Sequence, residues 1–587
     1  MATADESALP VAAVAAVLER YGLSRVHLAV AGAAALGLAA RLFELGARVA
    51  HWDEARVAYW TLRFAETGNY EYDAIIHGPF YHHVNRGVFA LLGPSDFSMR
   101  LAVAVLGGLF PLVALCFRDR LRDAEVVALA GLLAFNPVLL YYTRFMRGDP
   151  LVAMFAFAGF AFAVRAADTG RRRYVHACVL AVALAFTAKE NVLVTLLTWA
   201  GALALLLDHR LVTAAEGDEG PRAVLYDRLR HGAARLRRRW RTAALAVVEF
   251  LAVVVFFYAP RARTEPGPGL WKALAGPEAF VSTFPAVVSE ATVGAWQELW
   301  GTWVAGGHRG HAYLPYLTSY LETLAYAALV VGLFAVAGFL ADRYRADGPR
   351  DSVAFAAYWG FVSVLGYPVI TDIDAPWATV HAVVPLAVPA AVGLGLVVRW
   401  ARGAAADRAP LPAALAVFVC LLVVVQVAST GVVAVYQDEQ ADENRLTHFS
   451  QPADDFSVAM DRLDAAAPGH PGVDVVVYSD YFVRHASASG RREPGCARWF
   501  NLLPLPWYFE ASDARATCAT NETGLARAVE SDRPPLVVGR IEDQGTLVRT
   551  LDGYESRRYR IRSRGQYTLF FVRDDLAGAL SRRDDDI

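Results

Sequence analysis

"RVAHWDEARVAYWTLRFAETGNY", residues 48–70, directly follows a run of apolar residues long enough to cross a membrane. The stretch predicts an amphipathic helix that begins near Asp53 and Glu54 and ends at Gly68, since acidic residues favour a helix N-terminus and glycine favours its C-terminus. Two adjacent carboxylates beside a membrane span have two interpretations. They are a well-placed helix start, or they take part in chemistry at the membrane surface.

The composition is typical of a membrane protein that crosses the bilayer many times. The chain has 587 residues, of which 56% are hydrophobic, and a net charge of −2. Apolar runs of roughly 17 to 25 residues can span a hydrocarbon core about 30 Å thick. About eleven such runs are present, at residues 26–47, 98–117, 124–142, 149–166, 174–188, 191–208, 242–259, 317–341, 351–371, 378–399 and 411–436. We therefore expect a mostly α, polytopic transmembrane fold whose first span is an uncleaved anchor.

Arginine-rich loops alternate with loops of other composition, and this alternation predicts the orientation of the chain in the cell membrane. The basic loops, expected in the cytoplasm, are 118–123, 165–174, 208–241, 342–350 and 399–408. The expected parts are a cytoplasmic N-terminal segment 1–25, a membrane domain 26–436 with outer loops 48–97 and 260–316 and a cytoplasmic basic loop 209–241, and an extracellular domain 437–587.

The C-terminal region alternates strand-like and helix-compatible stretches, which predicts a small α/β domain. The expected strands are VDVVVYSD (473–480), PPLVVGRI (534–541) and QYTLFFVR (566–573). Cys496 and Cys518 lie in this region, where a disulfide can form if the domain faces an oxidising space. Asn521 begins an Asn-Glu-Thr sequon and is a candidate N-glycosylation site if the domain lies outside.

Polar residues that interrupt or border the spans gather on the proposed outer side. Ionisable groups near the bilayer are costly and mark a site or an internal ion pair, so their shared location predicts one outer-facing cavity. In YYTRFMRGDP, Arg144 and Arg147 lie on one face if the turn is helical, and two guanidinium forks can hold a phosphate. Lys189 in FTAKEN, one of only two lysines in the chain, also suits a phosphate oxygen. Internal pairs of Arg147 with Asp149 and of Lys189 with Glu190 are the alternatives.

The segment YDAIIHGPFYHHV contains three histidines, but their spacing does not match a zinc signature. We interpret His77, which precedes Gly-Pro, as a loop residue that forms a hydrogen bond with substrate. His82 and His83 are interpreted as residues of the membrane interface.

These motifs together resemble the GT-C class of integral-membrane glycosyltransferases. They are the acidic pair after the first span, HGP before an amphipathic helix, TR…RGD entering a span, AKEN where two spans meet, and DIDAPWATVHAVVPLAVPA (372–390) near the last spans. Residues 25–400 are most similar to the dolichyl-phosphate-mannose protein mannosyltransferase and aminoarabinose transferase branch. Within that branch the chain resembles archaeal flippase-activity-associated Agl proteins.

The resemblance implies an inverting transferase that moves a sugar, a hexose such as mannose, from a dolichyl or polyprenyl phosphate to a cell-envelope glycan or glycoprotein. Asp53, with Glu54 as the alternative, would be the catalytic base. Donor-phosphate and substrate binding would fall to His77, Arg144, Arg147 and Lys189, with Trp377 and His381 near the entrance for the lipid-linked sugar. Gly78 departs from the His-Pro-Pro-like motif of related transferases, which leaves the role of His77 open.

The same resemblance also allows a protein without catalytic activity. Such an accessory would bind lipid-phosphate sugars and assist their flipping in protein N-glycosylation, with a flippase or a glycosylation complex as partner. In either case the resemblance implies no cofactor, although the sequence leaves a divalent metal open, and we expect no nucleic-acid partner.

Overall fold

The computed structural model describes residues 23–577 of the chain apart from several short stretches. The stretches left out are 75–76, 216–225, 227–229, 233, 235–236, 264–265, 306–311, 372 and 485–495. Residues 1–22 of the expected N-terminal segment and part of the expected basic loop 209–241 therefore lie outside the described residues.

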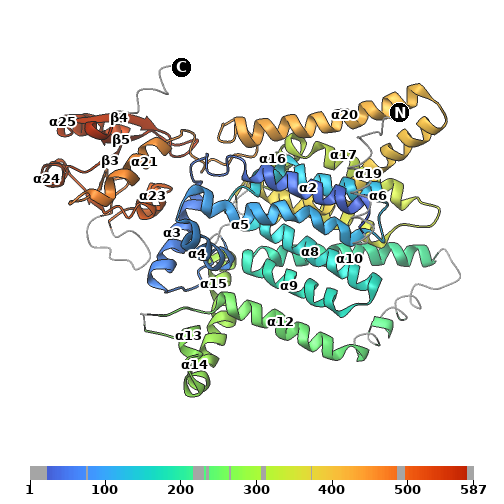
Figure 1. The fold of residues 1–587 in the computed structure, drawn as a ribbon. Coiled ribbons are helices and arrows are strands. Elements are labelled where there is room, and N and C mark those ends of the chain that lie inside the picture. The colour runs from blue at the N-terminus through green and yellow to red at the C-terminus, as the bar shows by residue number, and fades with distance from the viewer. Residues whose placement is uncertain are drawn as a thin grey trace, which may run out of the picture.

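The chain is mostly helical up to Gln437 (Figure 1). The helices of this part are α2 (Arg25–Leu42), α3 (Trp52–Thr67), α4 (Phe80–Leu92), α5 (Asp96–Leu109), η1 (Phe110–Phe117), α6 (Asp123–Phe135), α7 (Pro137–Tyr142), α8 (Gly148–Thr169), α9 (Arg172–Ala188), α10 (Val192–Ala215), α12 (Trp240–Tyr258), α13 (Leu270–Ala273), α14 (Pro277–Ser289), η2 (Glu290–Gly294), α15 (Ala295–Leu299), η3 (Trp300–Ala305), α16 (Tyr313–Ala327), α17 (Leu329–Arg343), α18 (Asp351–Ile370), η4 (Pro376–Thr379), α19 (Val380–Ala406), α20 (Pro410–Val432) and η5 (Val433–Gln437).

Seven helices in the described residues are long and apolar enough to cross a membrane. They are α2, the continuous α5–η1, α8, α12, α18, the continuous η4–α19, and the continuous α20–η5. The helices α16 and α17 form a pair bent by 94°, which brings the number to eight if the pair is one span. The protein is therefore a multi-pass membrane protein.

Each of the eleven expected apolar runs contains a helix, but by length and composition the described helices do not reach eleven spans. The run 124–142 divides into α6 and α7 because Pro137 starts a new helix, whose first N–H groups are capped by Asn136. Helix α9 has only 17 residues, and the apolar part of α10 covers Val192–Asp208.

The connecting loops gather at two opposite ends of the helical bundle (Figure 1). Ion pairs lie within or beside all five basic loops at one end, where Arg120 contacts Asp168 at 2.6 Å, Glu125 at the start of α6 contacts Arg350 at 2.7 Å and Arg399 at 3.0 Å, and Arg210 pairs with Asp351. At the other end lie α3, α4 and the C-terminal domain. The grouping follows the alternation of basic and other loops in the sequence.

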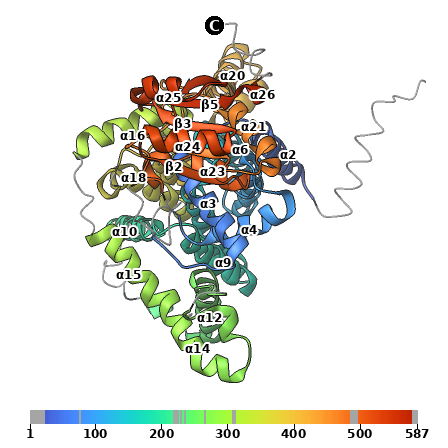
Figure 2. The ribbon, with the colours of Figure 1, turned by 90° about the vertical axis from the view of Figure 1, so that its left-hand side faces the viewer.

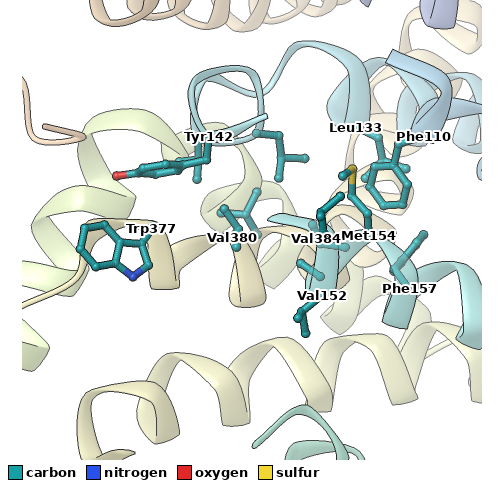
Figure 3. Packing of buried hydrophobic residues seen from close by; sticks show 14 of the residues in the cluster. Phe110, Leu133, Tyr142, Val152, Met154, Phe157, Trp377, Val380 and Val384 are labelled. Atoms are coloured by element: carbon teal, nitrogen blue, oxygen red, sulfur yellow. The ribbon is translucent and has the colours of Figure 1, made fainter. Parts of the chain in front are cut away.

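Helix α19 lies inside the bundle and α20 at its edge, since 83% of an apolar 18-residue window of η4–α19 is buried, against 6% of the corresponding window of α20–η5. The core packs apolar side chains of η1, α6, α8 and α19 against one another, as Figure 3 shows for Phe110, Leu133, Met154 and Val384. Trp377 and Tyr142 lie at one end of this cluster. That end leads to the polar residues of the candidate site.

The C-terminal domain is the expected small α/β domain (Figure 2). Its elements are α21 (Ser457–Ala466), η6 (Ala467–Gly469), β1 (Val475–Tyr478), α22 (Trp499–Leu502), α23 (Leu505–Ala511), β2 (Ala516–Ala519), α24 (Glu522–Asp532), β3 (Leu536–Arg540), η7 (Ile541–Asp543), α25 (Gln544–Thr550), β4 (Tyr554–Tyr559), β5 (Thr568–Arg573) and α26 (Asp574–Ala577). The sheet has the order β2-β1-β3-β5-β4, in which β1 pairs parallel with β2 and β3, and β5 pairs antiparallel with β3 and β4. The three expected strands are β1, β3 and β5; β2 and β4 were not predicted.

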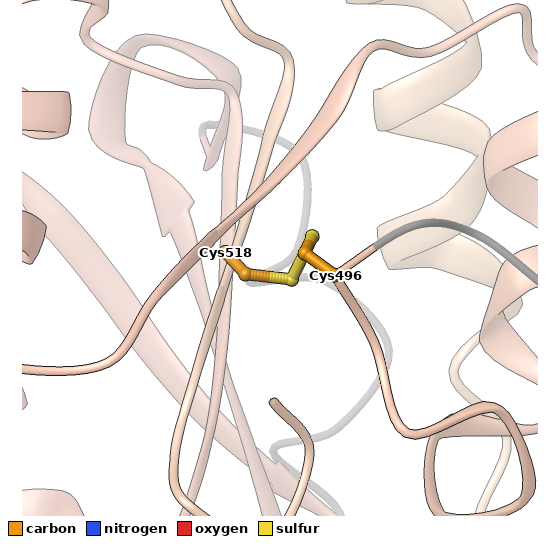
Figure 4. Close-up of a disulfide and its surroundings, with 2 residues drawn as sticks. All are labelled: Cys496 and Cys518. Carbon is orange, nitrogen blue, oxygen red and sulfur yellow. A yellow bond between two sulfur atoms is a disulfide. The ribbon is translucent and has the colours of Figure 1, made fainter. Parts of the chain in front are cut away.

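Two predicted features of this domain have defined places. A disulfide joins Cys496 to Cys518 on β2, with 5.8 Å between the Cα atoms (Figure 4). Asn521 is exposed and caps α24, where its side chain accepts a hydrogen bond from the Gly524 N–H at 2.8 Å.

The domain docks on the membrane part through α23, which packs against α3. The Tyr508 hydroxyl accepts from the Ala50 N–H at 2.7 Å and donates to Asp96 at 2.8 Å, and the Trp507 indole donates to the same carboxylate at 3.0 Å. Arg63 forms an ion pair with Glu510 at 2.9 Å. The domain therefore holds the segment that carries the acidic pair.

Candidate functional site

The acidic pair stands at the first turn of α3, as the sequence predicted. His51 caps the helix. The Nδ1 of its ring accepts from the Asp53 backbone N–H at 3.0 Å, and the His51 backbone N–H donates to the Glu54 carboxylate at 3.0 Å. At the other end Gly68 adopts a φ of 69°, the left-handed conformation that glycine tolerates best. The capping fixes the positions of both buried carboxylates at the end of the helical bundle.

Glu54 is fully occupied by partners inside the protein. Its carboxylate accepts two hydrogen bonds from Arg100, at 2.9 and 2.8 Å, and one from the Met146 N–H at 2.8 Å, and Arg48 lies 3.8 Å away. Burial alone would raise the pKa of Glu54, but the Arg100 charge and hydrogen bonds outweigh burial and lower the pKa to about 2. Glu54 thus ties α3 to α5 and to the turn before α8.

Asp53 shares one cation with a second carboxylate. The Arg147 guanidinium donates from Nη1 to Asp53, and its Nε lies 3.3 Å from Asp149 Oδ2 without the alignment of a hydrogen bond. The guanidinium also stacks on the Trp377 indole, 3.3 Å from the ring centroid. Burial would raise the pKa of Asp53, but the Arg147 charge holds that pKa well below its usual range.

Asp149 is the hub for the residues of the AKEN motif. Lys189 donates to its carboxylate at 2.8 Å, and Asn191 donates at 2.8 Å. The Nε2 atom of His381 on α19 lies 3.4 Å from the same carboxylate and accepts from the Asn191 side-chain N–H at 3.1 Å. The alternative in which Lys189 pairs with Glu190 is not formed, since Lys189 is held by Asp149 instead.

His77 lies against the same hub. Its Nδ1 accepts from the Gly148 N–H at 3.2 Å, and burial lowers the pKa of His77 to about 3, so the ring is neutral and carries its proton on Nε2. That Nε2 is buried and has no hydrogen-bond partner within the described part of the chain.

Gly78, the departure from the related motif, is required by packing. Its N–H donates to the Ala188 carbonyl at 2.9 Å, and an added Cβ would lie only 2.4 Å from the Thr187 carbonyl oxygen. Only glycine allows the HGP turn to approach the end of α9 this closely.

Arg144 lies apart from the cluster. Residues 143–147 form turns rather than a helix, so Arg144 and Arg147 do not share a helical face. The Arg144 guanidinium donates to the carbonyl oxygens of Ala40, Arg41, Phe43 and Glu44 and lies over the Tyr436 ring. It caps the end of α2.

The remaining histidines of the HGP segment have structural partners. His82 shares a hydrogen bond with Thr61 at 3.1 Å, and His83 lies 2.8 Å from the Phe257 carbonyl oxygen. Among the described residues, no group of three or more His, Cys, Asp or Glu side chains is placed to hold a metal ion.

Two residues of the cluster were missed by sequence reasoning. Asn191 directly follows Lys189 and Glu190, so the AKEN motif itself was the available signal. His448, in the chain between the last span and the C-terminal domain, packs against Trp377 with 4.7 Å between ring centroids. No local pattern marks His448, because its neighbours come from distant parts of the chain.

Comparison with solved structures relates this arrangement to known proteins. The chain is similar to ArnT from Cupriavidus metallidurans bound to undecaprenyl phosphate, with a TM-score of 0.53 and 15% identity over 92% of this chain and 97% of that chain. For apo ArnT the TM-score is 0.51, with 17% identity over 93% of this chain and 98% of that chain. The chain has the GT-C fold of membrane glycosyltransferases.

Two family matches accompany this GT-C fold. Residues 76–215 match the family described as dolichyl-phosphate-mannose-protein mannosyltransferase, and residues 456–574 match the Agl23 flippase-associated protein C-terminal domain. The archaeal oligosaccharyltransferase AglB from Archaeoglobus fulgidus, in complex with an inhibitory peptide and a dolichol phosphate, has a TM-score of 0.45 and 14% identity over 90% of this chain and 70% of that chain. No curated protein matches the sequence significantly. The ArnT-like fold and the match of residues 76–215 confirm the predicted resemblance to the GT-C class.

Proposed function

We propose that this GT-C protein transfers a sugar, a hexose such as mannose, from a dolichyl or polyprenyl phosphate to a cell-envelope glycan or glycoprotein. The observation that carries the proposal is the meeting of Asp53, His77, Arg147 and Lys189, from four separate segments, at one end of the bundle. The match of residues 76–215 to a dolichyl-phosphate-mannose-dependent family and the similarity to an ArnT bound to undecaprenyl phosphate support it.

Arg147 and Lys189 are the proposed phosphate-binding cations. An ammonium has three N–H donors, and Asp149 takes one of those of Lys189. A guanidinium has five N–H donors in a planar fork that suits phosphate oxygens. Arg144 is assigned a structural role instead, since four backbone carbonyls occupy it. Trp377 supports Arg147, and His381 supports Asp149.

Asp53 is the proposed base in a single displacement that inverts the anomeric configuration. The acceptor hydroxyl oxygen forms a bond to the anomeric carbon as the bond from that carbon to the phosphate oxygen breaks. The hydroxyl proton passes to the Asp53 carboxylate. The electron pair leaves with the lipid phosphate, and Arg147 and Lys189 stabilise its added negative charge.

The pairing of Asp53 with Arg147 orders these events. A carboxylate whose pKa is held low by a guanidinium is a weak base. A donor phosphate competes with Asp53 for Arg147, and the loss of that partner raises the basicity of Asp53. The base then becomes active only when the donor is bound.

The experiment is complementation of a deletion strain with wild type, Asp53→Asn, or Asp119→Asn, followed by mass spectrometry of the envelope glycans. Asp119 is an exposed carboxylate at the opposite end of the bundle, so its variant should restore a complete glycan. We expect Asp53→Asn to leave the glycan short by one sugar while the purified variant still binds dolichyl phosphate. A complete glycan with Asp53→Asn would contradict catalysis.

A non-catalytic accessory that assists flipping of lipid-linked sugars is the second candidate, and the match of residues 456–574 to a flippase-associated domain favours it. Both candidate functions involve binding of the same lipid phosphate, and in both a flippase or a glycosylation complex is the proposed partner. The Asp53→Asn variant distinguishes the two candidates, because an accessory without catalytic activity should still support a complete glycan when Asp53 is replaced.

The site is proposed to face the outside of the cell. The domain that docks at the site end contains the Cys496–Cys518 disulfide, and disulfides persist in oxidising compartments. The opposite end carries the basic loops expected in the cytoplasm. The N-terminus is then cytoplasmic and Asn521 lies outside.

A further inference from the structure

The chain between η5 and α21, residues 438–456, passes directly over the candidate site. Tyr142 donates from its hydroxyl to the Leu446 carbonyl at 2.6 Å, which ties this connecting segment to α7. The Trp52 backbone N–H donates to the Ser450 carbonyl at 3.4 Å, and the Gln451 side-chain amide donates to the Val49 carbonyl at 3.3 Å. The segment is therefore attached at two places. One is α7, which leads to Arg147, and the other is the stretch 49–52, which leads to Asp53.

His448 lies between these two attachments and against the site. Its ring meets the Trp377 indole edge to face at 4.7 Å and lies 6.0 Å from the His51 ring, measured between centroids. The same indole carries the Arg147 guanidinium at 3.3 Å. Only 8% of His448 is exposed.

One ring nitrogen of His448 is a hydrogen-bond donor without an acceptor. Its Nδ1 accepts from the Ser450 N–H at 3.4 Å, and burial lowers the pKa of His448 to about 2, so the neutral ring carries its proton on Nε2. This Nε2 is buried and has no hydrogen-bond partner among the residues that the structure describes. The His77 Nε2 is likewise buried without a hydrogen-bond partner among the described residues, and His77 contacts Gly148, the residue after Arg147. Buried donors without acceptors are rare because they cost free energy, so two beside one site point to a ligand.

The charges of the site indicate what such donors bind. Arg147 and Lys189 are already balanced by Asp53 and Asp149. A phosphate that enters this cluster adds negative charge, and neutral N–H donors stabilise it without the desolvation cost of further buried cations. An imidazole held by Trp377 beside Arg147 is suited to that task.

We infer that His448 donates its Nε2 hydrogen to an oxygen of the lipid-linked phosphate held by Arg147, an inference that rests on the proposed function. The connecting segment then completes the phosphate site from the C-terminal side of the chain. The C-terminal region then takes a direct part in donor binding, because the anchoring of the connecting segment sets the position of His448.

The test compares His448→Phe, which keeps a flat ring but removes the donor, with His448→Gln, which keeps an N–H donor. The full-length protein in lipid nanodiscs is titrated with dolichyl phosphate and with dolichol, and binding is followed by native mass spectrometry. His27→Phe, at the opposite end of α2, is the matched control. We expect His448→Phe to weaken dolichyl phosphate binding about tenfold, His448→Gln to restore most of it, and His27→Phe to bind as wild type does. Dolichol, which lacks the phosphate, should show no difference among the variants.

Kinetics distinguish this inference from the proposed function. His448→Phe should raise KM for the lipid-phosphate sugar about tenfold, with a much smaller effect on kcat and no change in melting temperature beyond that of His27→Phe. Wild-type affinity and KM in His448→Phe would overturn the role of His448 while Asp53→Asn still reports on transfer. Failure of the wild-type protein to bind dolichyl phosphate would overturn the inference and the proposed donor together.

Discussion

Asp53 and Glu54 are neighbours in sequence, yet their surroundings are opposite. Successive residues of a helix point about 100° apart, so the two carboxylates face different partners. Glu54 is 1% exposed and accepts hydrogen bonds from Arg100 and two backbone N–H groups. Asp53 has one guanidinium, which it shares with Asp149. The Glu54 carboxylate serves the fold, and the Asp53 carboxylate is available to chemistry.

Replacement of Glu54 by Gln should destabilise the protein rather than only slow a reaction. The change leaves Arg100 and Arg48 buried without their counter-charge, which costs about 3 to 5 kcal/mol. Thermal unfolding of the purified variant in detergent measures the effect. Glu66→Gln, at an ion pair whose side chain is 46% exposed, is the control and should change stability by no more than about 0.5 kcal/mol. Equal melting temperatures for Glu54→Gln and wild type would contradict the structural role.

The stabilisation by Glu54 should depend on pH in a defined direction. Its pKa falls from an ordinary value of 4.5 to about 2 in the folded protein. A lowered folded pKa means that the stabilisation is complete above the unfolded value and is lost as the pH falls from about 4.5 through about 2. The difference in melting temperature between wild type and Glu54→Gln should be constant from pH 7 to pH 5 and smaller at pH 3. A difference that grows with acidification would contradict this assignment.

At this scale the sequence predicted part of the site. The helix start and its end at Gly68 follow from local patterns, whereas the preference for Asp53 over Glu54 as base came from the family resemblance and stays a prediction. The division of labour between Arg144 and Arg147 does not follow from local patterns. Their spacing suggested a shared helical face, but the turn at 143–147 sends Arg144 to carbonyl groups at the end of α2, about a hundred residues away in sequence. Only the tertiary fold decides that contact.

The three short motifs HGP, RGD and AKEN meet through their backbones. The Gly78 N–H donates to the Ala188 carbonyl, and a Cβ at Gly148 would lie 2.6 Å from the same oxygen and 3.0 Å from the Lys189 Cβ. Glycine at both positions permits this approach. The turn before α4, the start of α8 and the junction of α9 with α10 are therefore one packed unit.

Gly148→Ala should damage this unit without a change in any charged residue. The added methyl forces the start of α8 away from Lys189, and overpacking of this kind costs about 1 to 3 kcal/mol. We expect dolichyl phosphate affinity to fall about tenfold, because Asp149, Lys189 and His77 lose their common geometry. Gly131→Ala on α6 is the matched control, since its Cβ would meet nothing within 4 Å. Unchanged affinity in Gly148→Ala, with Gly131→Ala as the reference, would show that the unit is not needed for donor binding.

The elements were predictable to different degrees. Hydrophobic runs located the membrane-spanning helices that the structure describes, but they did not show that Pro137 divides one run or that α16 and α17 meet at 94°. The motifs were recognisable one by one. Their convergence was not, because each contact joins residues 40 or more positions apart, as for Lys189 and Asp149.

The whole molecule places a soluble domain on the helix that carries Asp53. The sequence left this domain without a role, since nothing in β1 to β5 resembles a catalytic motif. In the structure its Tyr508 hydroxyl joins Ala50, three residues before Asp53, to Asp96 at the start of α5. The domain therefore fixes the position of Asp53 from outside the bundle, and the connecting segment places His448 at the same site.

Tyr508→Phe tests whether this docking sets the position of the base. The variant keeps the ring in place but removes the group that accepts from Ala50 and donates to Asp96, so the start of α3 loses its anchor while Arg147 and Lys189 keep theirs. We expect the rate of sugar transfer to fall about tenfold, the cost of one buried hydrogen-bonded group, with dolichyl phosphate affinity within twofold of wild type. Tyr344→Phe, at a side chain that is 79% exposed, should match wild type in both measurements. If Tyr508→Phe lowered affinity and rate equally, the domain would act on donor binding rather than on the base, and a wild-type rate would mean that α3 holds Asp53 without the domain.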